Sequence, residues 1–72
     1  MFETMVNGKD IIETVKRLYW ELKRPVSIEE VAQALGMPVA AILEAVSRLL
    51  EMGILEGSMD SLQPGPTNGL LL

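Results

Sequence analysis

The 72 residues suffice for one small domain, and domains of this size bury only about 60% of their unfolded surface. The chain contains neither Cys nor His, which excludes thiolate and imidazole metal sites, disulfides, nucleophilic Cys catalysis and a His general base. Its net charge of −4 is uneven: residues 1–25 hold five basic against four acidic groups, whereas residues 26–72 hold Arg48 against six acidic groups.

The first predicted helix covers about residues 8–23. Asn7 can cap its first amides, and Pro25 disfavours helical geometry at Arg24 and ends it. Its apolar face is formed by Ile11, Ile12, Val15, Leu18, Tyr19 and Leu22, which recur with the helical period.

The second predicted helix covers about residues 28–35. Ser27 and Glu30 have the spacing of a capping box, in which each side chain accepts a hydrogen bond from the other residue's amide. Val26 and Val31 stand at the positions of a hydrophobic staple. Gly36 provides the left-handed residue that commonly ends a helix.

The third predicted helix covers about residues 38–52. Pro38 suits a first helical turn, where its missing amide hydrogen costs nothing, and Gly53 closes the helix. Its apolar stripe consists of Val39, Ile42, Leu43, Val46, Leu49 and Leu50.

Beyond Gly53, residues 54–72 predict a hairpin. A first strand at 54–59 is followed by a mobile tip at 60–69, rich in turn-forming residues, and by a short return strand at 70–72. The alternative is a disordered tail after three helices.

The order of these elements resembles the winged helix-turn-helix family. The residues that carry the resemblance are Val31, Ala32, Leu35 and Gly36, followed by Ile42, Val46, Leu49, Gly53, Ile54 and Leu55. The resemblance implies a mainly α fold with a small β-hairpin, formed by a single stand-alone domain over residues 1–72. It also implies, by default, a regulator that places the third helix in the major groove and its wing against the DNA backbone.

The charges of the second half argue against that default. Phosphate neutralisation commonly needs about 6 to 10 contacts from Lys or Arg, and the predicted wing has no basic residue. Dimeric DNA binding therefore remains the alternative function. Its candidate contacts are Ser47, Arg48, Lys16, Arg17, Lys23 and Arg24.

We therefore expect the module to act through protein contact, by self-association or by docking in a regulatory or transcription assembly. The candidate partner surface consists of Val39, Ala40, Ala41, Ala45, Trp20 and Met37. The alternatives are a neutral helix surface for the alanines, a gap-filling role for Met37 and a lid over the core edge for Trp20.

The four basic residues of the first helix are either a solvated face or a site for an acidic partner. An apolar segment before this helix, with Met1, Phe2, Met5 and Val6, could join a dimer or partner surface.

Other classes of function are disfavoured. The adjacent Glu29 and Glu30 belong to a helix start, and residues 64–69 lack the Lys of a phosphate-binding loop, so we expect no enzyme, cofactor or metal. No apolar stretch approaches the ~20 residues that span a bilayer, and because the first eight residues lack the basic start and the apolar run of a signal peptide, we expect none there. We expect a cytoplasmic protein without membrane contacts.

Overall fold

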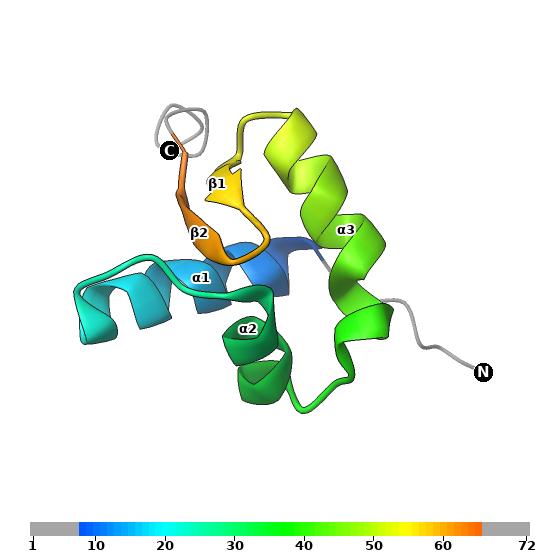
Figure 1. The fold of residues 1–72 in the computed structure, drawn as a ribbon, viewed down its shortest axis with the longest axis horizontal. Helices are drawn as coiled ribbons and strands as arrows, with labels where there is room; N and C mark the ends of the chain where they lie inside the picture. Colours follow the sequence, from blue (N-terminus) through cyan, green and yellow to red (C-terminus); the bar gives the residue numbers. More distant parts are fainter. Residues whose placement is uncertain (1–7, 66–72) are drawn as a thin grey trace.

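Three helices followed by an antiparallel hairpin make up the fold in the computed structural model, which describes residues 8–65 (Figure 1). In chain order the elements are α1 (Gly8–Leu22), α2 (Ile28–Leu35), α3 (Val39–Glu51), β1 (Leu55–Ser58) and β2 (Ser61–Pro64). The predicted fold class, a mainly α three-helix winged helix-turn-helix, is confirmed.

Helix α2 begins at a complete capping box. The Ser27 hydroxyl accepts from the Glu30 amide at 3.1 Å, and the Glu30 carboxylate accepts from the Ser27 amide at 2.9 Å. The amide of Ile28, in the first turn, donates to the carbonyl of Met59 at 2.7 Å. The hairpin turn therefore satisfies a helix amide that has no partner inside the helix.

Both α2 and α3 are closed by a glycine in the left-handed region. Gly36 has a φ of 70°, and the next amide, that of Met37, donates back to the carbonyl of Ala32 at 2.9 Å. Gly53 has a φ of 79°, and the amide of Ile54 donates back into the last turn of α3 in the same way. The two glycines therefore end the helices as expected, and they fix the helix-turn-helix geometry.

The hairpin is shorter and tighter than the sequence indicated. Strand β2 lies directly after a two-residue turn, so the expected mobile tip at 60–69 is wrong for residues 61–64. The physical reason is Leu62, whose side chain is completely buried in the core. Its backbone forms two hydrogen bonds with that of Val26, at 2.6 and 2.9 Å. Burial of this side chain outweighs the turn preference of its neighbours. The return strand expected at 70–72 lies outside the described residues, as do Asn7 and the apolar segment before α1.

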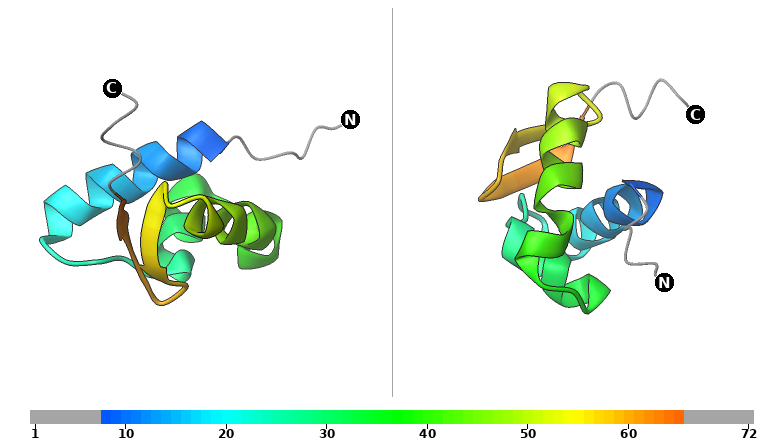
Figure 2. Two further views of the ribbon diagram at one scale, coloured as in Figure 1. Left: turned by 90° about the horizontal axis from the view of Figure 1, so that it is seen from above. Right: turned by 90° about the vertical axis from the view of Figure 1, so that its right-hand side faces the viewer.

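Every element contributes aliphatic side chains to one core. Strand β2 packs against α1 and β1 packs against α3, so the hairpin closes the core over the helices (Figure 2). The buried apolar residues are Ile11, Val15, Val26, Ile28, Val31, Ala32, Ile42, Val46, Leu49, Ile54, Leu55 and Leu62. This packing orients the outer face of α3 away from the core.

Two leucines assigned to buried stripes are exposed instead. Leu22 is the last residue of α1, where the helix extends past the hairpin (Figure 1). Leu43 is 46% exposed, because it lies about 100° around α3 from the buried Ile42 and falls at the edge of the stripe. The helix bounds also differ by one residue: α1 ends at Leu22 rather than 23, and α3 begins at Val39, with Pro38 as its cap.

Candidate interaction surface on α3 and the hairpin

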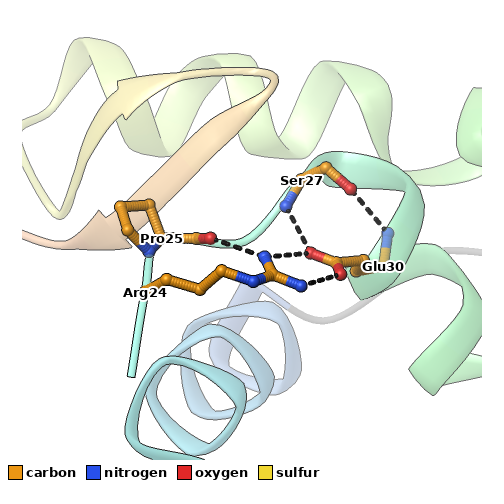
Figure 3. A network of polar contacts seen from close by, with 4 residues as sticks. All are labelled: Arg24, Pro25, Ser27 and Glu30. Atoms are coloured by element: carbon orange, nitrogen blue, oxygen red, sulfur yellow. Dashed lines mark hydrogen bonds and ion pairs between the residues drawn. The ribbon is translucent and has the colours of Figure 1, made fainter. Parts of the chain in front are cut away.

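A polar network fixes the start of the helix-turn-helix unit (Figure 3). The guanidinium of Arg24 donates to both carboxylate oxygens of Glu30, at 2.7 and 3.1 Å, and to the carbonyl of Pro25 at 2.9 Å. Two hydrogen bonds to the Glu30 carboxylate, the larger contribution from Arg24 and the smaller from the Ser27 amide, lower the pKa of Glu30 to about 2. Arg24, a candidate DNA contact, is therefore already engaged within the domain.

The outer face of α3 is nearly neutral, with small and acidic side chains. Apart from Leu43, which lies at the edge of this face, the exposed residues of α3 are Ala40, Ala41, Glu44, Arg48 and Glu51. The guanidinium of Arg48 lies 3.4 Å from the Glu44 carboxylate, which offsets the positive charge that α3 could offer a phosphate. Ser47, the other candidate base contact on this helix, is half-buried.

The hairpin adds negative charge beside this face. Among the residues of β1, β2 and their turn there is no Lys or Arg, and the charged residues are Glu56 and Asp60. Gln63 donates to the Glu56 carboxylate at 3.3 Å across the two strands. This part of the wing has no cation to place against a DNA backbone.

The structure narrows the candidate partner surface on α3. Ala40 and Ala41 are exposed, whereas Val39, Ala45 and Met37 are partly buried and pack against the core. The position of Met37 agrees with the gap-filling alternative. The accessible part of the surface therefore consists of the two alanines of the first turn of α3.

Trp20 is not part of the same surface. It is 69% exposed and lies near the C-terminal end of α1, the end remote from α3 in both Figure 1 and Figure 2. Lys16, Arg17 and Lys23 share this helix or its end. The candidate residues therefore form two separate surfaces, one on α3 and one on α1.

Two exposed apolar residues of the α3 region were not anticipated as surface groups. Leu43 lies at one edge of the outer face, and Met52, 61% exposed, directly follows α3. The position of Leu43 at the edge of its helical stripe is a sequence signal that could have identified it. Met52 lies in a turn, where helical periodicity carries no information.

The described residues hold no grouping of acidic side chains suited to a metal ion. Among residues 8–65, no helix combines the length and the apolar character needed to cross a bilayer.

Comparison with protein families places most of the described residues within a known family. The family model described as Sigma-70 region 3 matches residues 7–58, which is more than half of the 72 residues and includes all three helices and β1. No curated protein and no solved structure matches the chain.

Proposed function

Because this chain belongs to the Sigma-70 region 3 family, a family of winged-helix transcription-factor domains, we propose that it acts through protein contact within a transcription assembly. The proposal takes the module as non-enzymatic and as one cytoplasmic domain over residues 1–72, with another copy or another component of the assembly as its partner. The alternative is a dimeric DNA-binding regulator that uses α3 and the wing.

The observation that supports protein contact is the charge of α3 and the hairpin. A DNA-reading helix must bring cations to phosphates and donors or acceptors to base edges. On the outer face of α3, Arg48 lies beside Glu44, and Glu51 adds a further negative charge. The described hairpin residues contribute only negative charge at the place where a wing would meet the backbone.

The remaining cations do not compensate. Of the six basic residues, Arg24 is held by Glu30 and Arg48 lies near Glu44, and the other four lie on or just beyond α1. DNA binding commonly engages about 6 to 10 phosphates. These four cations lie on α1 or just after it, and none of them lies on α3 or the hairpin.

Ala40 and Ala41 form the centre of the proposed docking surface. Their small side chains permit close approach of a partner helix, and no charged group lies on these residues to be desolvated. Leu43 lies at the edge of the same turn and offers exposed apolar area. The surface is compatible with a helix of a partner protein packed across the start of α3.

An exchange of alanine for glutamate tests the proposal. We expect Ala41→Glu to weaken binding to purified RNA polymerase, or self-association measured by sedimentation, by at least about tenfold. Ala34→Glu makes the same change on an exposed position of α2 and is expected to leave binding unchanged. Equal binding by both variants would refute a docking role for α3.

A further inference from the structure

Trp20 is the most exposed aromatic side chain of the described region, and it lies outside the core. Trp20 follows the buried Ile11 by nine residues, which places it about half a turn away from the core at 100° per residue. It is 69% exposed and is not part of the core. An indole in this position exposes apolar area that only a partner could cover.

Cationic side chains surround this indole. Lys16 and Arg17 precede Trp20 by four and three residues on α1, so these three side chains lie on the same side of the helix. Lys23 directly follows the helix, with a φ of 60°. The ammonium of Lys23 lies 6.0 Å from the centre of the Trp20 ring, within reach of a cation–π contact. These four residues are called the Trp20 patch below.

The cations of the Trp20 patch are available to a ligand. No ion pair joins Lys16, Arg17 or Lys23 to a carboxylate within residues 8–65, in contrast to Arg24 and Arg48. Glu13 and Glu21 border the patch on the same helix, so its excess positive charge is small and acts over a short range. Such a surface favours a short acidic ligand in direct contact over a long polyanion attracted from a distance.

We propose that the Trp20 patch binds an acidic segment of a partner protein. An apolar side chain of that segment covers the indole, and neighbouring carboxylates pair with Lys16, Arg17 and Lys23. The inference rests on the proposed function in taking a protein as the partner. It adds the chemistry of that partner and places its contact on α1, apart from the alanines of α3.

Two other occupants fit the observations less well. A nucleic acid would find three cations, two bordering carboxylates and a chain of net charge −4. In a second copy, the acidic side chains outside α1 that form no ion pair within residues 8–65 are Glu29, Glu51, Glu56 and Asp60. They are divided among α2, α3 and the hairpin, and no two of them are adjacent in sequence, so the described region outside α1 offers no run of neighbouring free carboxylates.

The single tryptophan makes the patch directly observable. The probe is a Trp-free peptide of about twelve residues in which Asp and Glu flank one Phe and one Leu. We expect a saturable blue shift of Trp20 emission, with a Kd of about 10 to 500 μM that weakens several-fold between about 50 and 300 mM salt. The same peptide with Asn and Gln in place of the acids is expected not to bind. Equal binding of this neutral peptide would overturn the proposal.

Variants connect binding to the patch, with anisotropy of a labelled peptide as the measurement. Trp20→Ala should weaken binding about tenfold, with a melting temperature within about 3 °C of wild type because the side chain is exposed. Arg17→Gln should weaken it about threefold. Gln33→Glu changes the charge equally on the exposed face of α2 and should have no effect.

Further outcomes decide against the proposal. Unchanged binding by Trp20→Ala overturns it, as does tighter binding of duplex DNA than of the acidic peptide, or a Trp20 shift that depends on protein concentration without peptide. Ala41→Glu should not alter peptide binding. A negative result at the Trp20 patch would therefore not affect the proposal that α3 is a docking surface, and a negative result at α3 would not affect the proposal for the Trp20 patch.

Discussion

Two ion pairs of this domain differ in how tightly the fold holds them. Arg24 and Glu30 meet at 2.7 Å in a network that also includes Ser27, and their side chains are 52% and 33% exposed. Glu44 and Arg48 meet at 3.4 Å, with side chains 83% and 72% exposed, and neither side chain forms a further hydrogen bond within residues 8–65. The first pair orders the entry to α2, whereas the second can separate when another molecule approaches α3.

The specific polar interactions of the domain are concentrated at the start of α2 and are few on the outer face of α3. The start of α2 combines a capping box, a bidentate ion pair and backbone bonds to the hairpin, all of which serve the fold. The outer face of α3 has one weak ion pair and small side chains, so substitutions there change the surface and not the scaffold.

The largest effect is expected where the hairpin meets the core. Leu62→Ala should lower the free energy of unfolding by about 2–5 kcal/mol, because the side chain is fully buried and leaves a cavity. Leu43→Ala removes the same atoms from a half-exposed position on α3 and should cost less than about 1 kcal/mol. Urea unfolding followed by circular dichroism measures both. Equal losses would break the division between scaffold and surface.

Two glycines with a positive φ differ in how much space surrounds them. An added Cβ at Gly57, which has a φ of 102°, would collide with the carbonyl oxygen of Ser61, so Gly57→Ala should cost more than about 2 kcal/mol. Gly36 has a φ of 70° with open space around it, so Gly36→Ala should cost only about 1 kcal/mol. Thermal unfolding of the two variants tests this order, and the reverse order would contradict the described hairpin geometry.

The capping box should contribute about as much to stability as Gly36, and less than Leu62 or Gly57. Ser27→Ala removes the acceptor for the Glu30 amide and should cost about 1 kcal/mol. Ser47→Ala removes a half-buried hydroxyl from α3 that does not cap the helix. This change should alter the free energy of unfolding by less than about 0.5 kcal/mol. Chemical unfolding of both variants in parallel gives the comparison, and a larger loss for Ser47→Ala would assign the Ser47 hydroxyl a structural role.

The smallest effect concerns pH. The folded-state pKa of Glu30 is about 2, below its ordinary value of 4.5, so its stabilising contribution is complete above about pH 4.5 and is lost as the pH falls towards 2. The stability difference between wild type and Glu30→Gln should therefore shrink over this interval. A difference that stays constant with pH would show that the pair with Arg24 does not form.

The entry to α2 was predictable because its signals are local. Ser27, Glu30 and Gly36 act within a few residues of one another, and each signal indicated the same helix. The return strand was not predictable in the same way. Its position depends on the contact of Leu62 with Val26, 36 residues earlier, and no local preference encodes such a pairing.

The surface was harder to predict than the scaffold. Helical spacing alone brings Glu44 and Arg48 together, because residues four apart share one helix face. It could not show that Ala45 and Met37 are partly covered, or that Trp20 lies apart from α3, since these depend on how the elements pack together. The engagement of Arg24 by Glu30 also joins two elements and was not anticipated.

The central claim, that α3 and the hairpin face protein and not DNA, is tested most directly by titration with mixed-sequence duplex DNA at about 50 mM salt. Low salt favours any phosphate contact that exists, so the conditions are the most permissive for DNA binding. We expect no saturable binding up to about 100 μM protein. Micromolar affinity that falls steeply with salt and is lost in Arg48→Ala would contradict it.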